Sequence, residues 1–120
     1  MGKKTLLIII AVVFILILWF LIAPPQFVLD LVKPVDMSDS AAAGKAIITQ
    51  YECTSCHQIG EEGRSFGPRL DGVTRKMPVE ELRLWLLNPG SVKPGTAMPD
   101  LNLSNQEALA IISYLQSIDR

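Results

Sequence analysis

Three residues of the types that bind metals and cofactors lie together near the middle of the chain. Cys53 and Cys56 are separated by two residues, and His57 follows at once. Two cysteines at this spacing fall on one side of a turn and can bond the two vinyl groups of a haem. The adjacent histidine is then presented to the iron on the same face. The pattern C-x-x-C-H therefore predicts covalent attachment of one haem c.

Three other uses of these cysteines fit the sequence less well. A structural zinc site needs four ligands, and this cluster supplies three. A thioredoxin-like dithiol needs a βαβ context, and no strand pattern is visible in the sequence. A disulfide between Cys53 and Cys56 would close a loop too short to stabilise the fold much. Haem attachment is therefore favoured.

The second iron ligand cannot be another histidine of this chain, because His57 is the only one. The four methionines are Met1, Met37, Met77 and Met98. Met98 lies in the segment KPGTAMP, residues 93–99, where prolines and a glycine stiffen the loop and suit a thioether held at a fixed distance. Met98 is thus the predicted ligand, against the alternative of a buried core methionine.

The composition describes a small domain with an apolar attachment. The chain has 120 residues, of which 49% are hydrophobic and 19% charged, a length typical of one domain. The formal net charge of −1 gives no support for nucleic-acid binding through a basic surface. Two cysteines and one histidine exclude multi-cysteine zinc modules and disulfide-dense scaffolds.

The apolar excess is concentrated in residues 6–23, which carry no charge. As a helix this run spans about 27 Å, which matches the hydrocarbon core of a bilayer. Trp19 and Phe20 lie near its far end, where interfacial aromatic residues are favoured. Two prolines, Pro24 and Pro25, then stop the helix. The sequence predicts a transmembrane anchor over residues 1–23.

The flanking charges predict the orientation of this anchor. Lys3 and Lys4 precede the run and acidic residues follow it, so the tip, residues 1–4, is expected in the cytoplasm and the rest on the periplasmic or outer face of the inner membrane. A cleaved signal peptide is the alternative. It fits less well because the run is longer than a signal core and ends in LIAP, residues 21–24, without small residues at both cleavage positions.

Residues 24–39 form a connector that is too apolar for a freely solvated linker. Two alternatives stay open for it, a segment resting in the headgroup region or one packed on a partner subunit. Residues 40–120 form the globular part. Helices are expected over 40–51, over roughly 79–88, and after Ser104, where Glu107 completes a capping box. Loops are expected over 58–77 and 89–103. Such a domain needs a large apolar group to complete its core.

The globular part resembles a class I c-type cytochrome over essentially its whole length. The resemblance is carried by CTSCH at 53–57, GPRL at 67–70, KPGTAMP at 93–99 and the last helix with Ile111 and Tyr114. It implies an all-α fold, one transmembrane helix followed by a domain of three or more short helices wrapped round a covalent haem.

The resemblance also implies roles for single residues. His57 and Met98 are expected as the iron ligands, and Gly67 and Pro68 as part of the cofactor site, with the Pro68 carbonyl accepting a hydrogen bond from the other ring nitrogen of His57. Trp85 resembles a tryptophan that lies near a haem propionate. Gly44 is expected where the first and last helices cross, facing Ile111 and Tyr114, and Ile48 stands where the family usually has an aromatic residue.

These expectations together describe an electron carrier rather than an enzyme. With both axial positions filled, the iron has no open place for a small-molecule substrate. The resemblance extends to cytochrome domains that feed haem–copper terminal oxidases, so the expected partners are the lipid bilayer and redox proteins, such as a quinol-oxidising complex or a haem–copper oxidase, in a respiratory or photosynthetic membrane. The alternatives are a haem-based gas sensor and a chiefly structural subunit of a larger redox complex.

Overall fold

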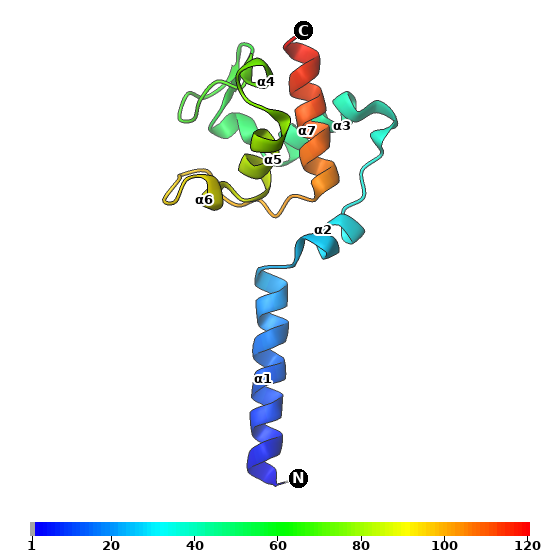
Figure 1. Ribbon diagram of the computed structural model, residues 1–120, viewed down its shortest axis with the longest axis vertical. Coiled ribbons are helices and arrows are strands. Elements are labelled where there is room, and N and C mark those ends of the chain that lie inside the picture. The colour runs from blue at the N-terminus through cyan, green and yellow to red at the C-terminus, as the bar shows by residue number, and fades with distance from the viewer. Residues whose placement is uncertain (1) are drawn as a thin grey trace.

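The computed structural model describes residues 2–120, which form a long helix and a small helical domain (Figure 1). The molecule measures 66 × 34 × 23 Å, and its long axis follows the first helix (Figure 1). Met1, one of the four methionines considered above, lies outside the described residues.

Helix α1 (Lys3–Ile22) is the apolar amino-terminal segment. Its 20 residues span about 30 Å at 1.5 Å per residue, and none of them is buried. The helix ends just before Pro24 and Pro25, which cannot continue it. Among residues 2–120, α1 is the one helix that is long and apolar enough to cross a membrane.

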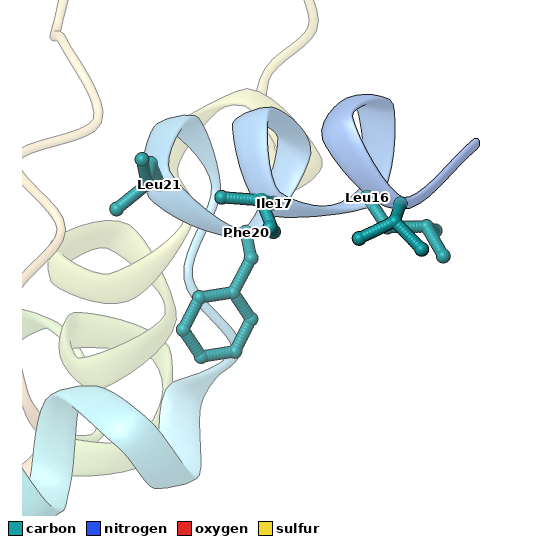
Figure 2. Close-up of a pocket in the computed structure, with 5 residues that line it drawn as sticks. Leu16, Ile17, Phe20 and Leu21 are labelled. Atoms are coloured by element: carbon teal, nitrogen blue, oxygen red, sulfur yellow. The ribbon is translucent and has the colours of Figure 1, made fainter. Parts of the chain in front are cut away.

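One face of α1 carries a shallow apolar hollow between side chains at helical spacing (Figure 2). It is lined by Val13, Leu16, Ile17, Phe20 and Leu21. Because all five lining residues are apolar, this face suits acyl chains or another apolar helix better than water.

Helix α2 (Gln26–Val32) lies in the connector, for which the sequence analysis assigned no secondary structure. Pro25 stands at its N-cap, and Leu29 is its buried residue. A short 3₁₀ helix, η1 (Met37–Asp39), follows, and the Asp36 side chain accepts a hydrogen bond from the Ser38 N–H at 2.9 Å. The connector packs on the domain itself, a contact that neither of the two alternatives had included.

Two helices from opposite ends of the domain form its centre. Helix α3 (Ser40–Gln50) has Asp39 as its N-cap, and the Asp39 side chain accepts a hydrogen bond from the Ala42 N–H at 3.0 Å. Helix α7 (Asn105–Ile118) begins with the predicted capping box, in which Ser104 and Glu107 satisfy each other's backbone N–H groups. Both helices and the capping box of α7 were predicted from the sequence, and these predictions are confirmed.

The crossing of α3 and α7 depends on Gly44. A Cβ added there would lie 1.9 Å from the Ala110 carbonyl oxygen and 2.9 Å from the Tyr114 Cβ, so the two backbones touch. The glycine was expected to face Ile111 and Tyr114. Tyr114 is confirmed as a neighbour, and the other close neighbour is Ala110 in place of Ile111. The buried core around this crossing consists of Ile47, Ile48, Ile59, Leu103, Ala110, Ile111 and Leu115.

A small antiparallel hairpin corrects the expectation that the globular part has no strand. Strand β1 (Gln58–Ile59) pairs with β2 (Glu62–Gly63). Each strand has two residues, too few for an alternating apolar pattern to be visible in the sequence. Gly60 and Gly63 have positive φ angles of 61° and 97°, a conformation that glycine adopts without strain.

Three short helices complete the domain between the hairpin and α7 (Figure 1). They are α4 (Val73–Lys76), α5 (Val79–Leu87) and α6 (Pro89–Val92). Helix α5 confirms the helix expected over roughly 79–88, with Pro78 at its N-cap. Helices α4 and α6 lie in segments that were expected to be loops, and each has only four residues, about one helical turn.

Candidate functional site

A single turn positions the two cysteines and the histidine. It begins at Glu52, whose φ of 52° is left-handed, and continues as the 3₁₀ helix η2 (Cys53–Ser55). The Cys53 carbonyl accepts from the N–H groups of both Cys56, at 3.2 Å, and His57, at 2.9 Å. The backbone of the C-x-x-C-H segment is thereby closed on itself, and its three functional side chains come from one turn, as the spacing predicted.

The two thiols have different surroundings. Cys53 is half-buried and packs against the core cluster, whereas Cys56 is exposed, and both are free cysteines. Burial raises the pKa of the Cys53 thiol, and a backbone hydrogen bond only partly opposes this. In the chain alone, Cys53 therefore stays protonated at neutral pH rather than acting as a reactive thiolate.

The imidazole of His57 is held by the segment that returns to it. Its Nδ1 lies 2.8 Å from the carbonyl oxygen of Pro68. A carbonyl can only accept, so Nδ1 carries the proton and Nε2 of the neutral ring keeps its lone pair for a metal. This is the contact that the sequence analysis expected between these two residues, and such a bond fixes both the tautomer and the ring orientation of a metal-binding histidine.

Gly67 lies close against the same ring. A Cβ added at Gly67 would stand 2.6 Å from Cε1, 2.8 Å from Nδ1 and 3.2 Å from Nε2 of His57. The Gly67 N–H donates to the Cys56 carbonyl at 2.7 Å, which fixes this close approach. The backbone at Gly67 and Pro68 thus forms a cradle for the imidazole. A residue with a Cβ at position 67 would clash with the ring.

The hairpin supports this cradle through residues that the sequence analysis did not assign to the site. A Cβ at Gly63 would lie 2.2 Å from the His57 carbonyl oxygen. The Asp71 carboxylate accepts from the Gly60 N–H at 2.5 Å and pairs with Arg69, and these two interactions lower its pKa. The two glycines were visible in the sequence, whereas the carboxylate gave no sequence signal.

Trp85 lies within α5, and Met98 lies in the loop between α6 and α7. Both are half-buried. Two turns shape the loop before Met98, in which the Thr96 N–H donates to the Lys93 carbonyl at 3.1 Å and the Met98 N–H to the Thr96 hydroxyl at 3.3 Å. Within residues 2–120 no hydrogen bond joins Met98 or Trp85 to the C-x-x-C-H turn.

Partly buried apolar side chains also pack on the core of the domain. Those packed on the core cluster include Cys53, Leu70, Val73, Leu86, Leu87 and Leu101. Cys53 belongs to the C-x-x-C-H turn itself, two of the leucines belong to α5, and the others come from the remaining segments between the turn and α7. A flat apolar group bearing a metal fits residues of these kinds, since the chain supplies two thiols, an oriented imidazole, a thioether and an apolar lining.

The comparison with known families decides what this arrangement is. A family model described as "Cytochrome c" matches residues 41–119. The chain belongs to the cytochrome c family. As a cytochrome c it carries covalently bound haem c and is an electron-carrier domain with the class I fold. Cytochrome c from Rhodothermus marinus has a similar structure, with a TM-score of 0.58 and 29% identity over 72% of this chain and 82% of that one.

Curated relatives of this cytochrome c are subunits of an oxidase and of a reductase. Subunit 2 of cytochrome c oxidase is 28% identical in Alkalihalophilus pseudofirmus over 65% of this chain, and 30% identical in Bacillus subtilis over 72%. A subunit of nitric oxide reductase from Stutzerimonas stutzeri is 30% identical over 68% of the chain. The matches span 25% and 28% of the two oxidase subunits and 60% of the reductase subunit.

Proposed function

We propose that this cytochrome c transfers single electrons with His57 and Met98 as its iron ligands, while anchored to a membrane by α1. The observation that carries the proposal is the 2.8 Å contact between His57 Nδ1 and the Pro68 carbonyl. It leaves Nε2 as the nitrogen available to iron and makes the imidazole a stronger donor. Cys53 and Cys56 of the same turn would hold the haem covalently.

Met98 is proposed as the second ligand. The residue is half-buried, and Gly95, with a φ of 75°, turns the loop that carries it. Met77 is also half-buried but ends α4, where its N–H donates to the Val73 carbonyl at 3.0 Å. A histidine and a methionine together would occupy both axial positions, leaving no place for substrate. Such ligation raises the reduction potential relative to two histidines.

The membrane anchor is proposed from the length, composition and exposure of α1. Its 20 residues are long enough to span the hydrocarbon core, and none is buried against the domain. Lys3 and Lys4 precede the apolar run and Asp30, Asp36 and Asp39 follow it. The lysines favour an inside amino terminus, with the haem domain on the outer face of the inner membrane.

The partners are proposed to be subunits of a membrane electron-transfer complex. The relatives named above are subunits of cytochrome c oxidase and of nitric oxide reductase, which supports a place beside a haem–copper type enzyme. Native membranes solubilised in a mild detergent test this proposal. The chain, followed by its haem absorbance, is expected to migrate with a large assembly, and migration as a small separate species would contradict it.

The ligand set is tested by a redox titration of the purified holoprotein. We expect Met98→His to lower the midpoint potential markedly, because a second imidazole favours the ferric state more than a thioether does. The matched control is Met77→His, which changes another half-buried methionine and should leave the potential near that of the wild type. An unchanged potential in Met98→His, or carbon monoxide binding to the reduced wild type at neutral pH, would contradict the proposal.

A further inference from the structure

Helix α2 has two faces with opposite properties. On the inner face, the Leu29 side chain is only 6% exposed. On the outer face, Phe27 is 70% exposed and Leu31 is 78% exposed. Phe27 and Leu31 stand four positions apart and therefore share one side of the helix. An aromatic and an aliphatic side chain at these exposures are costly in water.

The inner face of α2 is bonded to the start of α7. The Asp30 carboxylate accepts from the Asn105 N–H at 2.6 Å and from the Asn105 side-chain amide at 2.8 Å. These hydrogen bonds, the side-chain amide first, lower the pKa of Asp30, so it stays ionised beside the positive end of the α7 dipole. The Gln26 amide donates to the Leu103 carbonyl at 3.0 Å.

The residues after α2 extend this attachment. The Lys33 ammonium group donates to the Asn102 carbonyl at 2.7 Å and to the Tyr51 hydroxyl at 3.1 Å, and it lies 4.0 Å from the buried Glu107 carboxylate. The Ser104 hydroxyl donates to the Lys33 carbonyl at 3.1 Å. Side chains of the connector and side chains of the domain thus both contribute hydrogen bonds to this attachment. While these bonds persist, the connector cannot act as a flexible tether.

The position of α2 along the chain places it at the membrane surface. Only residues 23–25 separate the end of α1 from the start of α2, and three residues span at most about 11 Å. The headgroup region on each side of a bilayer is roughly 5–8 Å thick. Figure 1 shows α2 at the junction between α1 and the base of the domain. Phe27 and Leu31 are therefore held at the depth where interfacial helices bury their apolar faces.

We propose that the outer face of α2, carried by Phe27 and Leu31, is a lipid-binding surface that inserts into the headgroup–acyl boundary of the bilayer. The inference rests on the proposed membrane anchor and adds to it. Since the inner face of the same helix is bonded to α7, insertion of the outer face fixes both the height and the tilt of the haem domain above the membrane. The continuity of α2 with α1 is the reason for choosing lipid as the occupant.

Nitroxide labels at single introduced cysteines test this surface in the holoprotein. Cys53 and Cys56 are consumed by haem attachment, so Phe27→Cys and Leu31→Cys each supply the one free thiol. The labelled protein is placed in phosphatidylcholine vesicles, and collisions with oxygen, which partitions into lipid, are compared with those with a water-soluble nickel chelate. Ser117→Cys, exposed near the carboxyl end of α7 and far from α1 (Figure 1), is the aqueous control.

We expect the oxygen-to-nickel collision ratio at positions 27 and 31 to exceed that at 117 several-fold. Equal ratios at the three positions would overturn the proposal, and so would protection of 27 and 31 from both reagents, which would mean that a protein covers them. A fourth label, Val13→Cys in the middle of α1, distinguishes failure of the membrane anchor from failure of the lipid-binding surface on α2. If position 13 also faces water, the anchor itself fails. If 13 is in lipid while 27 and 31 are in water, only the surface proposed here fails.

Discussion

Substituting Gly67 by alanine is the sharpest test of how the chain holds its histidine. The new Cβ would lie 2.6 Å from Cε1 of His57, whereas ordinary contacts are 3.4 Å or longer. Either the imidazole or the backbone at position 67 must therefore move by about 0.8 Å. The bond from Nδ1 to the Pro68 carbonyl is 2.8 Å long and leaves the usual hydrogen-bond range beyond about 3.2 Å. The ring cannot move that far from Gly67 and keep this bond unless Pro68 follows it.

The expected cost follows from this overpacking. Inserting one methyl group against a fixed ring costs about 1–3 kcal/mol, which corresponds to a fall in Tm of roughly 4–24 °C for a domain of this size. Loss of the bond to Pro68 also makes the imidazole a weaker donor to iron. A weaker donor stabilises the ferric state less, so the midpoint potential should rise.

Thermal unfolding and redox titration of the holoprotein measure both effects. Gly90→Ala is the matched control, because it also replaces a glycine of ordinary backbone conformation. The Cβ added at Gly90 would meet only the Asn88 side chain, at 3.9 Å. We expect Gly90→Ala to stay close to the wild type in Tm and in potential. If Gly67→Ala behaves like Gly90→Ala in both measurements, the cradle argument is refuted.

Two further predictions concern the frame of the domain. Gly44→Ala should destabilise the fold by about 3 kcal/mol or more, because the new Cβ would lie 1.9 Å from the Ala110 carbonyl oxygen and one helix must move. Urea unfolding measures this loss of stability, and a loss below about 1 kcal/mol would contradict the prediction. For Asp119, burial opposes ionisation, but hydrogen bonds from Thr74 and Gly72 outweigh it and lower the pKa. Its contribution to stability is therefore complete above about pH 4 and disappears as pH falls through the lowered pKa. The gap in unfolding free energy between wild type and Asp119→Asn should be largest at pH 7 and shrink as the pH falls below about 4, and a gap independent of pH would refute this.

The sequence predicted the parts of the fold that depend on local patterns. The apolar run of α1, the capping box of α7 and the C-x-x-C-H turn each lie within a few consecutive turns of chain, so spacing alone reveals them. The contact between His57 and Pro68 joins residues 11 positions apart. It was expected only through the resemblance, because no rule of periodicity connects a histidine to a later carbonyl.

The attachment of α2 could not be predicted because its partners are far away in the chain. Asp30 bonds Asn105 across 75 positions, and Gln26 reaches Leu103 across 77. A seven-residue helix gives too short a pattern to show which of its faces is apolar. The sequence therefore showed that the connector was too apolar for a linker but not that its polar side chains already had partners in the same chain.

The pairing of α3 with α7 places the C-x-x-C-H turn and Met98 within one long connecting segment. The chain between them, residues 51–104, holds the C-x-x-C-H turn, the hairpin, α4, α5, α6 and Met98. Closing a loop of this length costs about 3.5 kcal/mol in chain entropy, and doubling the length would add only about 0.6 kcal/mol. The packing of α3 on α7 at Gly44 offsets this entropy cost with contacts that lie outside the loop. Segments of the loop can therefore be lengthened, shortened or exchanged while the α3–α7 pair persists. Redesign of the redox properties can thus proceed by grafting loop segments between two unchanged helices.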